Sequence, residues 1–203
     1  MNGDVTDIAA GVDFTCAVQK DAALCWGSND TGQLGNGSYT SSSVPEPVSG
    51  LESGVTAIAA SVFHACAVKD GEVWCWGENL AGALGDGTNQ NSSIPVKVAG
   101  LEGEIRMLVV GGSHTCVLTG AGGVKCWGAN ASGQLGDGST ENRNAPVDVS
   151  GLSSGVTAIA AGGSHTCAML ENGAVKCWGR NDDGQLGDGS NTDSNVPVDV
   201  RLK

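Results

Sequence analysis

Basic residues, aromatic residues and long apolar runs are all scarce in this sequence of 203 residues. Lys and Arg number only 10 against 22 Asp and Glu, which leaves a formal net charge of −12. An acidic surface repels phosphate, so we expect no nucleic-acid partner. No stretch approaches the roughly 18 apolar residues that a membrane helix needs, so we expect no membrane insertion.

Proline is also scarce, and no secretion leader is recognisable. The chain has 5 Pro beside 33 Gly, which excludes collagen. Glycine recurs at fixed places, which indicates many tight turns. The N-terminal Met1-Asn2-Gly3-Asp4 has none of the features of a signal peptide and favours a start codon placed on a mature or excised segment.

A tandem repeat of about 50 residues fills the chain. Each copy contains a Trp that opens the phrase Trp-Gly-x-Asn and is followed by Gly-x-Leu-Gly. These residues are Trp26, Trp76, Trp127 and Trp178, separated by 50, 51 and 51 residues. With no second domain or linker left over, we expect a single domain over residues 1–203. Its repeats are expected at about 4–53, 54–103, 104–154 and 155–203.

The residue pattern within one repeat predicts strands and no helix. In the last repeat, residues 156–161 form a short apolar segment bounded by Gly, as in a buried strand. Two further strands are expected at 165–170 and 174–178, and a short fourth at 197–200, which begins with Pro197. Four strands in about 50 residues predict an all-β fold, a β-propeller of four-stranded blades.

Eight Cys occur as two per repeat, on strands that flank a hairpin turn. Counting outward from the Asp70-Gly71 turn places Cys66 opposite Cys75. The four pairs are Cys16 with Cys25, Cys66 with Cys75, Cys116 with Cys126, and Cys167 with Cys177. Their spacing rises from 9 to 10 in the last two repeats, where the hairpin loop lengthens in step.

This pairing predicts four cross-strand disulfides, one per blade. Buried thiols and metal ligation are the alternatives, although no compact CxxC pair supports a metal. Disulfides require an oxidising compartment, so we expect an extracellular or cell-surface location.

One sequence phrase carries a family resemblance. In the last repeat it runs from His165-Thr166-Cys167-Ala168 through Val175-Lys176-Cys177-Trp178-Gly179 to Gly184-Gln185-Leu186-Gly187. It resembles the RCC1 repeat, and most of all the Cys-bearing bacterial versions found in secreted or surface proteins. The resemblance covers all four repeats and implies a propeller, usually of seven blades. Four repeats are therefore half of an eight-bladed ring or a propeller fragment.

The strand with which the chain begins, and the strand with which it ends, suggest that two copies assemble. Residues 5–8 read as the second strand of an incomplete blade, and residues 197–200 as a strand left over at the other end. We expect two copies to exchange these strands and form a homodimer with two-fold symmetry. The rival interpretation is a half-propeller cut from a longer chain, or an engineered one.

No catalytic constellation, cofactor site or metal site stands out from the repeat. His64, His114 and His165 share one position, where the first repeat has Phe14, so we expect them to be structural. The loop 181–184 is rich in oxygen ligands but lacks the distal Glu of a calcium loop. A recurring Asp or Asn before Gly is expected to cap turns. These residues are Asn36, Asp86, Asp137 and Asp188.

Aromatic residues divide into a repeated set and a set that breaks the repeat. The four repeated Trp, at 26, 76, 127 and 178, are predicted to anchor the core between blades. Trp74, Phe63 and the single Tyr39 break the repeat. Two other repeats have Lys at the position of Trp74, which favours exposure and contact with a partner. Filling a local gap between blades is the alternative.

These features favour a non-catalytic propeller that binds an unidentified protein partner or serves as a scaffold, outside the cell. One alternative is an engineered or excised fragment with no evolved partner. Another is guanine nucleotide exchange, as in the eukaryotic namesake of the family, which the acidic charge and the paired Cys disfavour.

Overall fold

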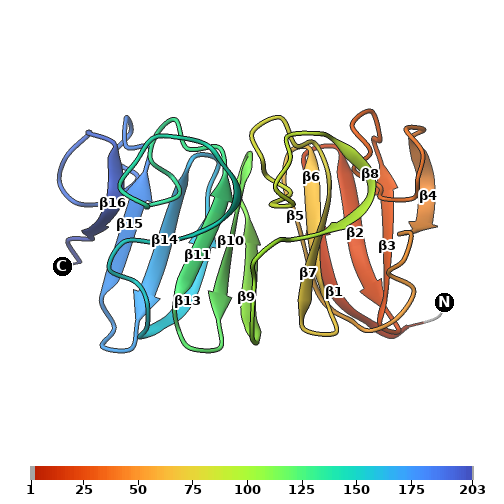
Figure 1. The fold of residues 1–203 in the computed structure, drawn as a ribbon, viewed down its shortest axis with the longest axis horizontal. Helices are drawn as coiled ribbons and strands as arrows, with labels where there is room; N and C mark the ends of the chain where they lie inside the picture. The colour runs from red at the N-terminus through yellow and green to blue at the C-terminus, as the bar shows by residue number, and fades with distance from the viewer. Residues whose placement is uncertain (1–2, 203) are drawn as a thin grey trace.

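A computed structural model describes residues 3–202 of the chain. The described part contains sixteen strands and no helix, and therefore no helix that could cross a membrane. The strands form four antiparallel sheets of four consecutive strands each, which we call blades. Figure 1 shows the blades side by side, with the two chain ends at opposite sides of the molecule.

Each blade is built from one repeat. Blade one contains β1 (Val5–Ala10), β2 (Phe14–Gln19), β3 (Ala22–Gly27) and β4 (Ser42–Pro47). Blade two contains β5 (Val55–Ala60), β6 (His64–Lys69), β7 (Glu72–Gly77) and β8 (Ser92–Lys97). Blade three contains β9 (Ile105–Val110), β10 (His114–Thr119), β11 (Val124–Gly128) and β12 (Arg143–Asp148). Blade four contains β13 (Val156–Ala161), β14 (His165–Leu170), β15 (Val175–Gly179) and β16 (Ser194–Asp199). The all-β propeller-blade architecture is as predicted.

The hairpin between the second and third strands has the expected register. Asp70 and Gly71 both have positive φ, 51° and 81°, as a two-residue hairpin turn of the primed type requires. Cys66 pairs directly with Cys75 in blade two. In blades three and four, where the loop is one residue longer, Cys116 pairs with Cys126 and Cys167 pairs with Cys177. The predicted register of these hairpins is therefore confirmed.

The fourth strand is longer than predicted. β16 starts at Ser194, so Pro197 lies within the strand and not at its start. This is tolerated because β16 is the edge strand of its sheet, where the missing N–H removes no bond to a further strand.

The predicted phase of the chain ends is wrong. β1 is the first strand of a complete sheet, in the order β1-β2-β3-β4, and β16 completes the sheet of blade four. Every blade takes its fourth strand from its own repeat, so neither end of the described chain has a missing or a surplus strand. A homodimer formed by exchange of terminal strands loses its basis for this reason.

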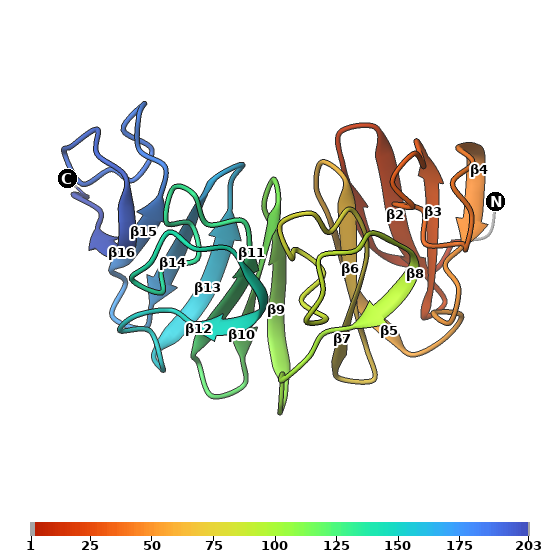
Figure 2. The same cartoon turned by 45° about the horizontal axis from the view of Figure 1, so that its top comes forward.

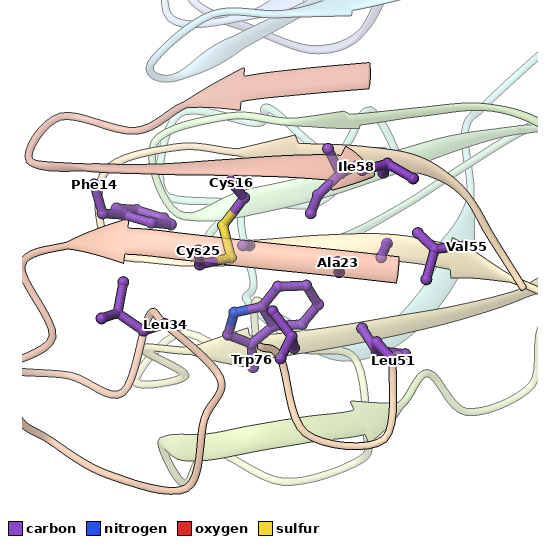
Figure 3. Close-up of a cluster of buried hydrophobic side chains, with 13 residues drawn as sticks. Phe14, Cys16, Ala23, Cys25, Leu34, Leu51, Val55, Ile58 and Trp76 are labelled. Carbon is purple, nitrogen blue, oxygen red and sulfur yellow. A yellow bond between two sulfur atoms is a disulfide. The ribbon is translucent and has the colours of Figure 1, made fainter. Parts of the chain in front are cut away.

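The hydrophobic core lies between blades. The first cluster joins Cys16, Leu34 and Leu51 of blade one to Ile58 and Trp76 of blade two. Figure 3 shows the Trp76 ring beside the Cys16–Cys25 disulfide and near Leu34 and Leu51. Equivalent clusters join blade two to blade three and blade three to blade four. The first strands of successive blades contact each other, and Figure 2 shows the blades in a curved row.

Candidate interaction surfaces

The four predicted disulfides are present, and no cysteine of the described chain is free. Each joins the second and third strands of one blade across Cα–Cα distances of 4.0 to 4.1 Å. From blade one to blade four, the bonds are Cys16–Cys25, Cys66–Cys75, Cys116–Cys126 and Cys167–Cys177. The predicted pairing of all eight Cys is confirmed. Buried thiols and metal ligation are thereby set aside.

Two of the three His link adjacent blades. His64 Nε2 lies 3.0 Å from Thr115 Oγ1, and His114 Nε2 lies 2.9 Å from Thr166 Oγ1. Each Thr hydroxyl donates to a backbone carbonyl at 3.0 Å, so its oxygen must accept from the imidazole. The hydrogen-bond network therefore places a proton on Nε2 of both His.

Burial keeps these two imidazoles uncharged. Burial, reinforced by the neighbouring His, lowers the pKa of His64 to about 3 and that of His114 to about 4. A side chain that is neutral, buried and bonded to the next blade is not available as a general base near neutral pH. The His thus act as structural links between blades.

The first interface uses a different pair at the same positions. Phe14 stands where blades two to four have His, and Ala65 stands where blades three and four have Thr. Both lie in the same buried cluster. The polar pair is replaced on both sides at once, so no buried hydroxyl or imidazole loses its partner.

Acidification is expected to destabilise the protein through these His. Below the ordinary His pKa of 6.5 the unfolded chain takes up protons that folded His64 and His114 do not bind. Each group then costs about 1.4 kcal/mol per pH unit, or on the order of 4 kcal/mol for the pair between pH 6.5 and about pH 5. Guanidinium unfolding at neutral pH and at about pH 5 measures the difference.

The matched control is the double variant His64→Phe with Thr115→Ala, which copies the Phe14–Ala65 pair. It should lose roughly half of the pH dependence. An unchanged dependence in the double variant would contradict the assignment to His64.

Three repeated Trp bind the preceding blade. Trp76, Trp127 and Trp178 are fully buried, and each indole N–H donates to a backbone carbonyl of the preceding blade at 2.9 Å. The receiving loop is Gly-x-Leu-Gly. A Cβ on Gly35 would lie 2.8 Å from the Trp76 indole, and its φ of +67° also favours glycine. Trp26 is only half-buried, because the described chain has no blade before it.

Polar residues of the long loops serve the fold. The Asn of each Trp-Gly-x-Asn phrase is buried, and its Oδ1 accepts the backbone N–H of the loop Leu, as in the 2.9 Å bond from Leu34 to Asn29. Asp86 Oδ1 accepts the backbone N–H of Thr88 at 2.9 Å, which is a turn cap as predicted. Among residues 3–202, no group of three or more His, Cys, Asp or Glu could hold a metal ion.

Phe63 is exposed on the turn between β5 and β6. It is 41% exposed and lines a cleft of about 220 Å³ with Val62 and Ser113. An adjoining cleft that also contains Ser113 is lined by Leu80, which is 70% exposed. The turn that carries Val12, 66% exposed, bonds to Ser61 of the next blade. Val12, Val62 and Phe63 thus lie on turns between first and second strands, and Leu80 lies on the loop between β7 and β8. We call these four residues the turn-face patch.

Sequence reasoning identified only Phe63 of these four residues. The other three could have been found as Phe63 was, because each differs from its equivalents in other repeats. Leu80 stands where other repeats have Asp30, Ala131 and Asp182. Val12 and Val62 stand where blades three and four have Gly. All four departures fall in blades one and two.

The other two candidate contact residues lie elsewhere. Trp74 is half-buried against the first core cluster and lines a separate cleft of about 320 Å³ with Leu51, Lys69 and Ile94. Its indole nitrogen is buried and has no hydrogen-bond partner in the described structure. Tyr39 is 57% exposed and lines neither cleft. The structure thus does not bring Phe63, Trp74 and Tyr39 together.

Comparison with protein families gives a match over most of the chain. A family model described as Regulator of chromosome condensation (RCC1) repeat matches residues 20–68, 70–118, 121–169 and 172–203. A second RCC1 repeat model matches residues 55–83 and 156–185.

Curated relatives match over shorter stretches. The protein RCC2 homolog of Danio rerio is 44% identical over 79 residues, which cover 38% of this chain and 16% of the relative. The ultraviolet-B receptor UVR8 of Arabidopsis thaliana is 39% identical over 84 residues, which cover 41% of this chain and 19% of the receptor. The matched stretches thus span less than one fifth of either relative.

Solved structures share the fold over the whole chain. Human WBSCR16 is 27% identical with a TM-score of 0.86, covering 100% of this chain and 54% of its own. Yeast RCC1 (Prp20), crystallised with Kap60, is 22% identical with a TM-score of 0.86, covering 98% of this chain and 49% of its own. The four blades therefore span about half the length of these solved chains.

Proposed function

We propose that this chain, which belongs to the RCC1 repeat family, is a non-catalytic module that binds a protein partner through its turn-face patch. The observation that carries the proposal is the exposure of Phe63 and Leu80, at 41% and 70%, beside adjoining clefts. Exposed aromatic and aliphatic side chains grouped on one face are typical of protein contact sites.

The polar groups of the fold support a binding role over a catalytic one. His64 and His114 are held neutral between blades, and the loop Asn and Asp bond their own loops. None of these groups is free to act as an acid or a nucleophile.

The relatives give further support. One matched relative is named as a receptor. The yeast protein Prp20p, whose solved structure shares this fold, is described with binding to Gsp1p and histones.

We propose an extracellular or cell-surface location for the same module. Four disulfides close its blades, and disulfides persist in oxidising compartments. Residues 1–203 would act as one domain there, with the four repeats as its blades. The proposal also includes self-association into a homodimer, with the copies packed end to end instead of exchanging strands.

The patch is tested by replacing two of its residues with the residues that another repeat carries at the same positions. Phe63→Ser and Leu80→Ala together give blade two the residues that blade three carries at Ser113 and Ala131. We expect partners captured by the wild-type protein, and identified by cross-linking and mass spectrometry, to be lost by at least about tenfold. The free energy of unfolding should stay within about 0.5 kcal/mol of wild type, because both side chains are exposed.

Tyr39→Asn is the matched control. It replaces another exposed aromatic residue with the residue that blade two has there, Asn89, and leaves the patch intact. Partners retained equally by all three proteins would exclude the patch as the binding site.

A further inference from the structure

The N-terminal end of the blade row presents an uncovered interblade face. Val5 is 54% exposed, whereas its equivalent in blade two, Val55, is 1% exposed. Ile8 is 65% exposed, whereas Ile58 is 6% exposed. Trp26 is half-buried, whereas its equivalent Trp76 is fully buried and donates its indole N–H to Gln33 O of the preceding blade. We call Val5, Ile8, Thr15 and Trp26 the N-terminal end face.

The C-terminal end presents the opposite face of the same interface. Met169 is 45% exposed, whereas its equivalent Leu118 is fully buried. A Cβ on Gly136 would lie 2.8 Å from the Trp178 ring, but a Cβ on Gly187 would meet only Val200. The loop of blade four is therefore shaped for an indole that the described chain does not supply. We call His165, Met169, Gln185 and Gly187 the C-terminal end face.

The polar residues on the two end faces complement each other. Within the chain, each interface pairs His with Thr, or Phe with Ala. The C-terminal end face carries His165, and the N-terminal end face carries Thr15 at the Thr position. A Phe–Thr or His–Ala combination would leave a buried polar group without its partner. The chain thus carries both members of a matched fourth pair.

A backbone carbonyl oxygen on the C-terminal end face also matches donors on the N-terminal end face. Gln134 O accepts both the Trp178 indole N–H at 2.9 Å and the Thr166 hydroxyl at 3.0 Å. Its equivalent in blade four is Gln185 O, which accepts no hydrogen bond in the described structure, and the matching donors are Trp26 and Thr15.

The edge strands offer one more pair of groups. Gly138 N donates to Asn195 O at 2.9 Å across the last internal interface. The equivalent groups on the two end faces are Gly189 N and Ser43 O.

On this basis, and resting on the proposed self-association, we infer that the partner of each C-terminal end face is the N-terminal end face of a second copy of this chain. Two such contacts, related by two-fold symmetry, would close a ring of eight blades. Each contact would bury Ile8 and Met169, seat Trp26 on the Gly187 loop and form a His165–Thr15 hydrogen bond. Every blade would then have a neighbour on both sides.

Light scattering and sedimentation at micromolar concentration test the assembly. We expect a mass about twice the chain mass of 20.2 kDa. A strict monomer would overturn both the self-association and this inference. Assemblies larger than two copies would overturn the closed ring of two.

A double-variant cycle tests the pairing. Thr15→Ala alone and His165→Phe alone each leave one polar group unpaired, and we expect each to raise the dimer dissociation constant about tenfold or more. The double variant rebuilds the Phe14–Ala65 pair and should recover most of the affinity. Two independent losses that simply add in the double variant would overturn the pairing.

A steric and charge block gives a second readout. Ile8→Arg should abolish the dimer, whereas Ile94→Arg, a change at another exposed aliphatic residue that lies outside both end faces and outside the turn-face patch, should not. In solutions dilute enough to keep all three proteins monomeric, both variants should unfold at the wild-type denaturant midpoint, since both side chains are exposed in the monomer. A dimer indifferent to Ile8→Arg would overturn the inferred interface while leaving self-association in place. Neither result bears on partner binding by Phe63.

Discussion

Replacing all eight cysteines with alanine is expected to lower the free energy of unfolding by on the order of 10 kcal/mol. Each disulfide closes a loop with a sequence separation of 9 or 10 residues. Loops of this size contribute about 2.5 kcal/mol each by restricting the unfolded chain. Because domains of this kind are stable by only about 5–15 kcal/mol in total, most of the variant population should be unfolded at room temperature.

Circular dichroism and guanidinium unfolding measure this loss. The comparison series removes one disulfide at a time, for example by Cys66→Ala with Cys75→Ala, and each step should cost about 2.5 kcal/mol. Mass spectrometry of the denatured wild-type protein, with and without reductant, should show a gain of two hydrogens for each disulfide reduced. An eight-alanine variant with the wild-type unfolding midpoint would contradict a stabilising role for the disulfides.

The second large effect is expected at an interblade tryptophan. Trp127→Ala should cost about 3–5 kcal/mol, the range for removing a large buried aromatic side chain. Trp127 is fully buried and fills the space over Gly85. Ala83 O would keep its bond from Thr115, so most of the loss comes from packing.

Trp26→Ala is the matched control, because the same repeat position is half-buried there. In a solution dilute enough to keep the protein monomeric, it should cost less than about 1.5 kcal/mol. Thermal or guanidinium unfolding of both variants gives the comparison. Equal costs at the two positions would mean that the preceding blade contributes little to the burial of Trp127.

The features that sequence predicted well depend on counting along one hairpin. The Asp70-Gly71 turn determines which residues face each other, so the Cys66–Cys75 pairing followed from the loop length alone. The one-residue longer loop of blade three likewise brings Cys116 opposite Cys126. The repeat period and the strand number per repeat determined the blade in the same way. Each of these is a relation between neighbours in the chain.

The phase of the blades could not be obtained in that way. A period shows that four strands recur, but it does not show which strand of the series a blade begins with. Residues 5–10 occupy the repeat position of residues 156–161, which were predicted as the first strand of the last repeat, and the hydrogen-bonded sheet order places both segments first in their blades.

The burial of Trp74 also depended on contacts that sequence does not show. Lys at the equivalent positions suggested exposure, but Lys125 and Lys176 have side chains only 30% and 27% exposed. Their stems lie along the blade while the ammonium groups reach Asp148 and Asp199 at 2.6 Å. A Trp at that position therefore has its ring largely covered. Pairs between blades, such as His64 with Thr115, were missed for the same reason.

The completion of each sheet within its own repeat has a consequence for biosynthesis. A blade needs no strand from a later repeat, so its hydrogen bonds and its hairpin disulfide can form while the following repeats are still being translated. The two Cys of each hairpin are 9 or 10 residues apart, and loops of that size close in about 10–100 ns. Native thiols therefore meet each other far more often than they meet the Cys of other blades, roughly 50 residues away. We expect the chain to acquire its correct pairing in order from the N-terminus, with little need for disulfide reshuffling.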